Sequence, residues 1–600
     1  MLANVSIMLS KRVLKYFLLT VLCLFILALT IMHLPKTGNH YTRMFHFNKF
    51  QPLREFQNKA GPKALQKDSL NNCRNPFCPS LSARQKRRHY TYEDHIPSQI
   101  SWKSLLDMTH PNFTSFHITK TNRNNASKFF VCDELRLIIQ ARNGLNESKT
   151  YGGDYFRAKI YTKNSTFQAS SMSDGEVVDH GNGTYSALFT LKWAGLVNIQ
   201  VTLVHTSEAN YVLRRFQKEE VIRIKYQGRF YSKESKKSKE TYCNMDLKVL
   251  QKTKAKEKVK TESCNFTDTR TGAPWFCVKP QDFSCSDYVM HHGVGSAMSK
   301  RDTSNIERLS FTWKDQRITG SENSIVVHHM PGKESVVHNG AVNHLPACTP
   351  KIQFGTPEVA GFYWGKNWLS ADCGMHTFNK SRAISLLRNK TVHLLGDSTI
   401  RQLFEFYTEF FELETGSKLL PVWYYGPTIV KDSKNNITFH FQFHGLPNGR
   451  GAWGNVSNFE YIANIIDRIE GGENTIFVLT LWAHFTPHPP SYYEARVESM
   501  LMSIRRLHVR SPRTLVIWKS ANTREHGRLD HALRNSDWTA RDLDRRMRNK
   551  VFAYENVGFM DAWDMTNAQF EKHALHPIGS HVENLSNKLL SYVLNHDKNE

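Results

Sequence analysis

Two residues of this chain, Ser398 and His576, have the types and the setting that acyl transfer requires. Ser398 lies in the stretch VHLLGDSTI (392–400), where an apolar run leads directly into Gly-Asp-Ser. A serine hydroxyl becomes a nucleophile when a base takes its proton, and His576 stands in a loop-like segment, LHPIGS, before a last helical pattern. Each residue also has a structural alternative: Ser398 could cap the helix that follows it, and His576 could be a structural loop histidine.

Further polar residues follow the other strand-like runs of the same region. Gly396, His484 and Asn522 are candidates for oxyanion or substrate binding. His484 could equally be a histidine that only packs at this edge of the sheet, and Asn522 could simply cap a turn. Asp561 and Asp564 follow one strand, and at most one of them is expected to support His576, while the other would cap a helix or bind water.

These residues share one rim only if the region from about 390 folds as an α/β domain. Apolar runs and amphipathic segments alternate here, which predicts a parallel sheet with helices on both faces. In such sheets, functional residues gather at the carboxyl ends of the strands. The expected strands are 391–395, 438–443, 475–481, 514–518 and 557–560, and the expected helices are about 400–413, 459–470, 492–508, 535–549 and 582–594.

Residues 96–228 follow a different pattern. The stretch DGEVVDHGNGTYSALFTLKWAGLVNIQVTLVHTSEA contains turn glycines and strict apolar alternation at Val197, Ile199, Val201 and Leu203. Short strands with glycine turns predict a β-sandwich, and the pattern resembles the filamin-type immunoglobulin-like repeat. Residues 229–350 begin with a run of mixed charges, which we interpret as a basic linker followed by a cysteine-bearing segment.

The N-terminus indicates the secretory pathway. An apolar run at 16–34 is long enough to span a bilayer, and Lys11, Arg12 and Lys15 precede it, so the expected order is a cytosolic tail (1–15), a signal anchor (16–34) and a lumenal stem (35–95). A cleaved signal peptide is the alternative. A dibasic cluster at Arg84–Arg88 could be a processing site, or only a solvated charge cluster.

Sequons and cysteines agree with a lumenal chain. The expected glycosylation sites are Asn112, Asn125, Asn146, Asn164, Asn182, Asn265, Asn379, Asn389, Asn436, Asn455 and Asn584. Beyond the anchor the cysteines are Cys73, Cys78, Cys132, Cys243, Cys264, Cys277, Cys285, Cys348 and Cys373. We expect disulfides among them, and their odd number leaves one free thiol or an intermolecular bridge.

Composition and charge narrow the function classes. The chain is 40% hydrophobic and 12% aromatic, which is typical of folded domains. A chain of 600 residues is too long to fold around one ordinary core, so two or more domains are expected. The formal charge of +25 would suit nucleic acid, but a lumenal location argues against that partner. Anionic glycans, or a solvated surface without a partner, fit better.

The motifs together carry a family resemblance. LLGDSTIRQ, with His-Pro before the last helix, resembles the SGNH/GDSL hydrolase superfamily in its PC-esterase branch, and with DGEVVDHGNGTY and FMDAWDMT the chain resembles the neurexophilin and PC-esterase domain (NXPE) family. The resemblance implies residues 351–600 as the SGNH-like domain. That superfamily usually has Asp-x-x-His, but His573 occupies the acid's position here. Asp564 is then the first choice for the acid and Asp561 the second, unless the site works as a dyad.

The same resemblance implies oxyanion donors from a Gly and an Asn, which the segment LWAH (481–484) lacks, so His484 or a backbone N–H would substitute. We expect a Golgi-lumenal, single-pass type II O-acetyltransferase or O-acetylesterase that acts on glycan hydroxyls, with sialic acid as one candidate. The acyl donor, with acetyl-CoA as a candidate, would be a substrate, and no metal or bound cofactor is expected. The alternative is an inactive cell-surface or secreted glycoprotein that binds a protein partner through its neurexophilin-like region.

Overall fold

The computed structural model describes residues 95–120, 128–219, 223–256, 262–296, 303–329, 345–350, 361–413, 425–448, 453–554 and 556–596. All of them belong to one compact unit, Lys67–Glu600. The expected tail, anchor, stem and Arg84–Arg88 site lie outside the described residues. Within the described ranges, no helix combines the length and apolar character needed to cross a membrane.

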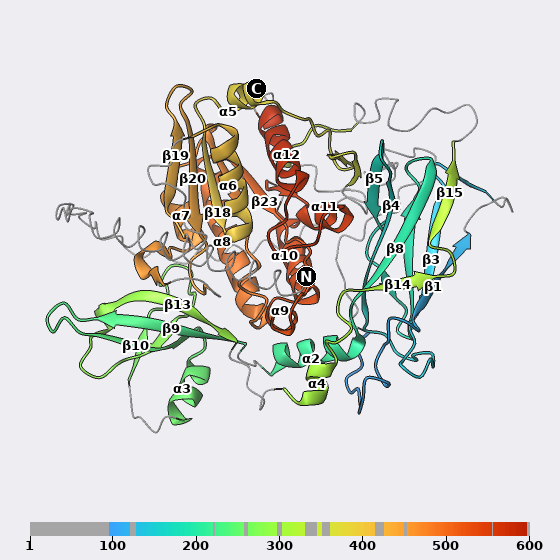
Figure 1. Cartoon of the computed structure of the whole chain (residues 1–600). Coiled ribbons are helices and arrows are strands. Elements are labelled where there is room, and N and C mark those ends of the chain that lie inside the picture. Colours follow the sequence, from blue (N-terminus) through green and yellow to red (C-terminus); the bar gives the residue numbers. More distant parts are fainter. Residues whose placement is uncertain are drawn as a thin grey trace, which may run out of the picture. The chain divides into compact units, whose positions relative to one another are not determined.

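Twelve strands of the described chain form a mixed sheet, which we call the β domain (Figure 1). The hydrogen-bonded order is β17-β16-β5-β4-β8-β14-β1-β3-β7-β6, with β15 and β2 joined beside β8. The bounds are β1 (Ser115–Lys120), β2 (Phe129–Phe130), β3 (Glu134–Gln140), β4 (Tyr155–Lys163), β5 (Gln168–Met172), β6 (Val178–Asp179), β7 (Thr184–Thr190), β8 (Gly195–His205), β14 (Gln316–Gly320), β15 (Ser324–His328), β16 (Gly361–Trp364) and β17 (Asn367–Ser370).

The predicted alternation explains the core of the β domain. Val197, Ile199, Val201 and Leu203 are buried in turn along β8, and the same happens along β3, so both strands fill a single apolar cluster. The sheet extends past the predicted boundary at residue 228, because β14 and β15 pair with β8, and β16 pairs with β5. The chain therefore returns twice to the β domain before it enters the C-terminal domain.

A second sheet, which we call the cysteine module, has the order β11-β12-β10-β9-β13-β21. Its strand β9 begins before residue 229, where the basic linker was expected to start, and β10 lies inside that expected linker. Ile224, Tyr226, Gly228 and Phe230 are buried along β9 while their neighbours are not, so alternation builds one apolar face. The bounds are β9 (Ile224–Tyr231), β10 (Ser238–Asn244), β11 (Ser263–Asn265), β12 (Phe276–Val278), β13 (Tyr288–Ser296) and β21 (Gly454–Asn455), with α3 (Leu247–Lys256) after β10.

Disulfides stabilise this part of the chain. Two bridges lie in the cysteine module, and a third precedes the C-terminal sheet; they are Cys243–Cys277, Cys264–Cys285 and Cys348–Cys373. Cys132 is also disulfide-bonded. The prediction of disulfides is thus confirmed for these cysteines.

The C-terminal domain has the predicted parallel sheet, in the order β19-β20-β18-β22-β23-β24. All neighbours are parallel except the edge strand β19, which the sequence did not reveal. The bounds are β18 (Thr391–Gly396), β19 (Thr428–Asp432), β20 (Ile437–Phe443), β22 (Thr475–Leu479), β23 (Leu515–Lys519) and β24 (Gly558–Met560). Each predicted strand of this sheet is therefore present.

Helices cover both faces of this sheet (Figure 1). One apolar cluster contains side chains of α5, α6, α11 and α12, and another contains side chains of α7, α8 and α10. The bounds are α5 (Lys380–Leu387), α6 (Ser398–Phe410), α7 (Ile462–Arg468), α8 (Pro490–Arg510), α9 (Leu529–Arg534), α10 (Asp537–Val551), α11 (Ala562–Ala568) and α12 (Ser580–His596), while α2 (Ser207–Lys218) and α4 (Asn305–Leu309) flank the β domain.

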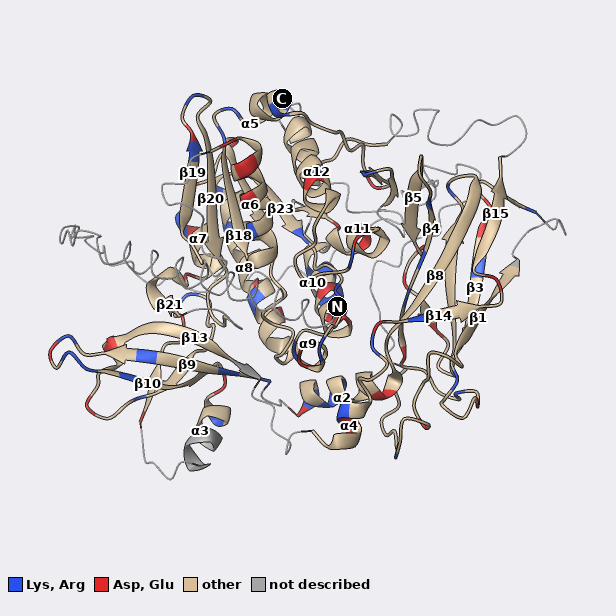
Figure 2. Cartoon of the chain, in the orientation of Figure 1, with Lys and Arg blue, Asp and Glu red and all other residues tan. Residues whose placement is uncertain are grey.

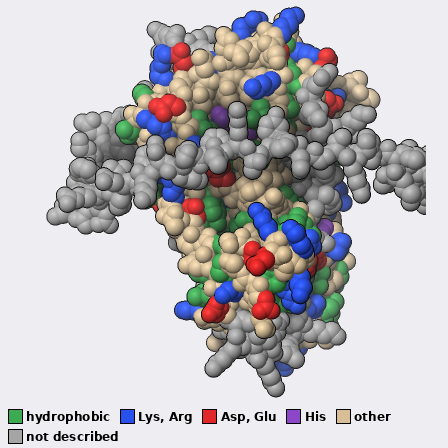
Figure 3. Space-filling view, turned by 90° about the vertical axis from the view of Figure 1, so that its left-hand side faces the viewer, with side chains coloured by type: hydrophobic (Ala, Val, Ile, Leu, Met, Phe, Trp, Pro, Cys, Tyr) green, Lys and Arg blue, Asp and Glu red, His purple; other side chains and the backbone are tan. Residues whose placement is uncertain are grey.

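Charged residues are mixed rather than separated. Figure 2 shows basic and acidic positions side by side on α10. On the face drawn in Figure 3, Lys and Arg side chains near the tip of the β9–β10 hairpin also have acidic neighbours. At these two places the described basic side chains therefore have acidic neighbours, so neither is a purely basic patch.

Candidate active site

Ser398 lies where the strand order of the C-terminal sheet reverses. From β18 the chain goes to β20 on one side and then to β22 on the other. This switch point is the usual ligand position in open α/β sheets. Asp397, not Ser398, is the N-cap of α6, because its side chain accepts from the Thr399 N–H at 2.8 Å. The capping alternative for Ser398 is therefore wrong.

The structure brings Ser398 and His576 together. Nε2 of His576 lies 2.7 Å from Oγ of Ser398, although the two residues are 178 positions apart. Ser398 is the first residue of α6, so the positive end of the helix dipole faces its hydroxyl. This is the geometry of a nucleophile and its general base.

The surroundings of His576 favour its neutral form. His576 is exposed to solvent. Its pKa is nevertheless lowered, chiefly because the protein packed around the ring desolvates it, and the charge of Arg401 adds to the shift while Asp397 opposes it. A neutral imidazole can accept the serine proton at neutral pH.

Gly396 has a structural reason to be glycine. Its φ is +157°, and a Cβ there would lie 2.3 Å from the carbonyl oxygen of Thr480. The strand ends of β18 and β22 could not approach so closely with any side chain at this position. Gly396 thus lets the Asp-Ser turn sit against the neighbouring loop.

His484 lies close to the dyad. Burial lowers its pKa to about 4, with Asp397 opposing the shift and His576 and Arg401 adding to it. Its ring packs against Phe443 at a centroid distance of 5.1 Å. The nearby Ala483 N–H, a backbone alternative for the oxyanion donor, donates to Asp397 at 3.1 Å and is already used.

Asn522 is placed differently from its predicted role. Its side-chain amide donates to the backbone carbonyls of Ala574 (3.4 Å) and Leu575 (3.3 Å), directly before His576. These contacts occupy the donor that an oxyanion would need. Asn522 instead holds the loop that bears the base.

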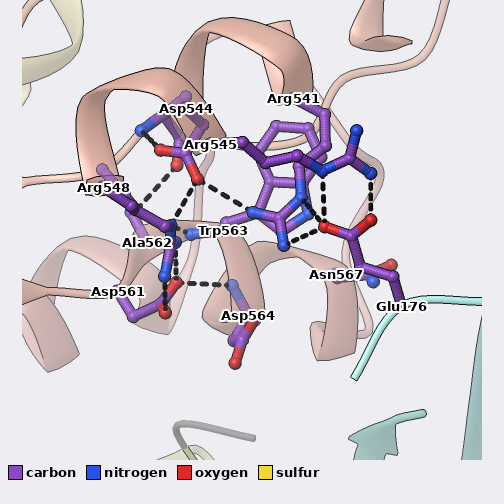
Figure 4. A network of polar contacts seen from close by, with 12 residues as sticks. Glu176, Arg541, Asp544, Arg545, Arg548, Asp561, Ala562, Trp563, Asp564 and Asn567 are labelled. Atoms are coloured by element: carbon purple, nitrogen blue, oxygen red, sulfur yellow. Dashed lines mark hydrogen bonds and ion pairs between the residues drawn. The ribbon is translucent and has the colours of Figure 1, made fainter. Parts of the chain in front are cut away.

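The two predicted acids belong to another network (Figure 4). Both carboxylate oxygens of Asp561 accept from Arg548, at 2.6 and 2.8 Å, and Asp561 also caps α11 by accepting from the Asp564 N–H. Within the described chain, neither carboxylate hydrogen-bonds to His576. The paired guanidinium explains why the predicted role of Asp561 is not realised in this geometry.

His573, at the position where the superfamily has its acid, is also not free to serve. Its Nδ1 lies 2.7 Å from Oγ1 of Thr523, and its carbonyl accepts from the Glu525 N–H at 2.8 Å. Burial holds its pKa well below the ordinary value, so the ring is neutral. The described residues therefore present a Ser–His dyad, which the sequence had left as one alternative.

Sequence reasoning missed two cations at this site. Arg401 lies one turn after Ser398 on α6, and the i,i+3 spacing was the available signal. Lys519, at the end of β23, donates to Oγ1 of Thr399 at 3.3 Å. Burial lowers its pKa to about 8, and the charges of Asp397 and Asp544 oppose that shift.

The predicted glycosylation sites divide clearly. Asn584 is buried in α12: its side-chain oxygen accepts from Trp368 N–H at 2.8 Å, and its amide donates to two carbonyls. It cannot accept a glycan in this fold, so that prediction is wrong. Asn125 lies outside the described residues. The other predicted acceptors are exposed: Asn112, Asn146, Asn164, Asn182, Asn265, Asn379, Asn389, Asn436 and Asn455.

Two comparisons with known families bear on this chain. Residues 368–593 match the model described as NXPE family member 4-like, C-terminal domain. Residues 124–302 match the model described as Neurexophilin. The first match contains both Ser398 and His576, and the second contains most of the β domain and the cysteine module.

Proposed function

This chain belongs to the NXPE family, and from that membership and the contact between Ser398 and His576 we propose that it is a serine-dependent O-acyltransferase or O-acylesterase. The observation that supports the proposal most is the 2.7 Å distance from His576 Nε2 to Ser398 Oγ at the switch point of the sheet. A helix cap alone would not need a histidine there.

The reaction would proceed through an acyl-enzyme. His576 takes the proton of Ser398, whose oxygen attacks the donor's carbonyl carbon; the donor's leaving group departs with a proton returned by His576. An alcohol or water then attacks the acyl-enzyme, loses its proton to His576 and releases Ser398 as its hydroxyl. The dipole of α6 would stabilise the negative charge on the tetrahedral intermediates, and His484 and Arg401, which interact electrostatically with His576, are candidates to add to this.

The proposed substrate is a hydroxyl of a cell-surface glycan, with an acetyl group as the acyl unit. A site presented on a stem in the Golgi lumen, anchored by 16–34, would meet glycans during their maturation. Sialic acid is one acceptor whose carboxylate would suit a chain with a formal charge of +25. Acetyl-CoA is the candidate donor, consumed as a co-substrate.

The match to the Neurexophilin model supports a second function, in which the protein binds a partner through its N-terminal region. A test of that function needs the whole β domain. Residues 95–290 alone would omit β14, β15, β16 and β17, which pair within its sheet. A fragment used to measure binding should therefore extend through Cys373, which also keeps the Cys348–Cys373 bridge.

Glycan analysis separates the two functions. Cells that lack the protein would receive the wild type or Ser398→Ala, and mass spectrometry would measure O-acetylation of released glycans. We expect wild type alone to change it, upward for a transferase and downward for an esterase. Equal O-acetylation with both forms would contradict an enzymatic role and leave the binding function.

A further inference from the structure

The segment that bears His576 begins on the surface of the β domain. It follows α11, and the last carbonyls of that helix accept hydrogen bonds from two strands of the other domain. Lys159 of β4 donates through Nζ to the carbonyl of Gln569 at 2.8 Å, and Ser170 of β5 donates through Oγ to the carbonyl of Ala568. A point seven residues before the base is thus held from outside the C-terminal domain.

Side-chain packing extends the same contact. The Asn567 amide lies 3.8 Å from Sδ of Met172, and the ring of Phe570 meets Tyr161 edge-on at a centroid distance of 6.4 Å. Nζ of Lys163 lies 5.5 Å from the centre of the Phe570 ring. Four consecutive residues, 567–570, therefore contact β4 and β5.

These contacts fit the end of a helix. The last carbonyls of a helix have no partner within it, and a cation beside them is favoured by the helix dipole. Lys159 and Ser170 supply the donors that α11 itself lacks. Lys159 is half-buried, and its pKa is lowered to about 8, mainly because the surrounding protein desolvates the amine.

Ionic contacts fix the neighbouring helix to the same domain (Figure 4). Glu176, which follows β5, accepts from Arg541 at 2.6 Å and also pairs with Arg545, both on α10. The guanidinium of Arg541 lies 4.9 Å from the ring centre of Trp563 on α11. The β domain therefore contacts both helices that flank β24.

From the other side, the C-terminal domain holds the same loop by two amides. Asn522 donates to the carbonyls of Ala574 and Leu575, and Gln402 of α6 donates to the carbonyl of Pro577 at 2.9 Å. Gln402 lies one turn after Ser398, so the contact ties the base loop to the helix of the nucleophile. With no carboxylate of the described chain on the ring, the backbone of this loop must set the position of His576.

We propose that β4 and β5, through Lys159 and Ser170, position His576 for proton transfer, so that the β domain is a working part of the catalytic site and not a separate binding module. Lys159 and Ser170 are positioning residues, because they act through the loop and not on substrate. The inference rests on the proposed acyl-transfer function of Ser398. An error of about 1 Å in such a base can lower a rate by about 100-fold.

The test compares variants of the whole lumenal chain. Lys159→Met and Ser170→Ala remove the two donors, Lys159→Arg keeps a donor, and Arg136→Met on β3 is a matched control several strands away in the sheet. The first readout is the rate at which an activated acetyl ester modifies Ser398 between about pH 5 and 8. The second readout is amide hydrogen exchange of residues 569–576.

We expect Lys159→Met to slow modification by about 10- to 100-fold, with faster exchange in 569–576 and an unchanged melting temperature. Ser170→Ala should show a smaller loss, Lys159→Arg should recover part of the rate, and Arg136→Met should match the wild type. Because Ser170→Ala removes one oxygen only, it keeps the test valid if Lys159→Met fails to fold.

The outcomes separate this inference from the proposed function. If Ser398 of the wild type is acetylated, and Lys159→Met and Ser170→Ala match the wild type in acetylation rate and in amide exchange, the positioning role is overturned. If wild type is never modified, the proposed function fails, and the exchange data alone decide whether β4 and β5 hold the loop. Equal exchange in all variants would then overturn the inference as well.

Discussion

Two sets of polar side chains follow strands of the same parallel sheet, and they differ in how completely they are paired. After β24, Asp561 joins a closed network with Arg548 and Asp544, in which all three side chains are buried. After β18, Ser398 pairs with His576, which is exposed to solvent and has no carboxylate of the described chain as a hydrogen-bond partner. The carboxylates of Asp561 and Asp544 thus stabilise the fold, whereas the hydroxyl of Ser398 stays accessible.

The two sets of side chains have different roles at the same edge of the sheet. When both oxygens of a buried carboxylate accept from one guanidinium, breaking the pair destabilises the fold, and the carboxylate is not available for catalysis. A hydroxyl with one partner, placed at a helix N-terminus, retains its reactivity. Changes in the closed network should therefore alter stability, while changes in the dyad should alter rate.

The largest expected effect is on rate. His576→Ala should slow the hydrolysis of an activated acetyl ester by about 10²- to 10⁴-fold, because the general base is lost, without changing the melting temperature. His180→Ala, an exposed histidine of the β domain, is the control. Equal rates for both variants, measured by steady-state kinetics, would remove His576 from the mechanism.

The next effect is on stability. Asp561→Asn should lower the free energy of unfolding by about 1.5–3 kcal/mol, because the buried Arg548 guanidinium loses one of its two carboxylate partners and keeps only Asp544. Asp542→Asn, which breaks a half-exposed pair with Arg546 on the same helix, should cost less than about 1 kcal/mol. Urea unfolding would measure both.

If Asp561 were instead the acid of a triad, Asp561→Asn would reduce the rate per folded molecule. The ester assay, corrected for the folded fraction, therefore tests whether the two regions have separate roles. Unchanged stability with a lost rate would reverse the assignment.

A third prediction contrasts two histidines five residues apart. His581 is buried without a hydrogen bond to either ring nitrogen in the described chain, and burial lowers its pKa to about 3. Below about pH 6.5 this histidine takes up a proton in the unfolded chain but not in the folded chain. The free energy of unfolding therefore decreases by about 1.4 kcal/mol for each pH unit by which the pH is lowered. His581→Leu should reduce that slope in unfolding measured from pH 7 to 5, and an unchanged slope would contradict the burial effect.

The smallest effect concerns the pH profile. Arg401 contributes to the lowered pKa of His576, so Arg401→Gln should raise that pKa and move the lower midpoint of the rate profile to higher pH. We expect a shift below about 1 pH unit, since the pair is partly solvated. A shift to lower pH would mean that Arg401 does not act on His576 by its charge.

Much of this account could be predicted from the sequence, where local patterns decide. Apolar runs followed by amphipathic segments located the strands that end at Lys519 or before Asp397, His484 and Asp561, and the loop before the last helix located His576. The hairpin β9–β10 was missed because β9 crosses the predicted boundary at residue 228, and β10, inside the charged run, has no apolar alternation that would mark a strand.

The rest depends on contacts between distant segments. No local sequence pattern shows that Arg548 would donate to Asp561, that Lys159 would donate to the carbonyl of Gln569, or that β16 would pair with β5. Asn584 likewise satisfies a sequon, but the fold buries it against Trp368. Local rules thus place reactive groups, and tertiary pairing decides which of them remain available.

The most direct test of the account is peptide mapping of the lumenal protein after exposure to an activated acetyl ester. If Ser398 is the nucleophile and His576 its base, the wild type acquires one acetyl group on the Ser398 hydroxyl, His576→Ala acquires the same label more slowly, and Ser398→Ala acquires none. Labelling at another residue, or no label on Ser398 in folded wild-type protein, would contradict it.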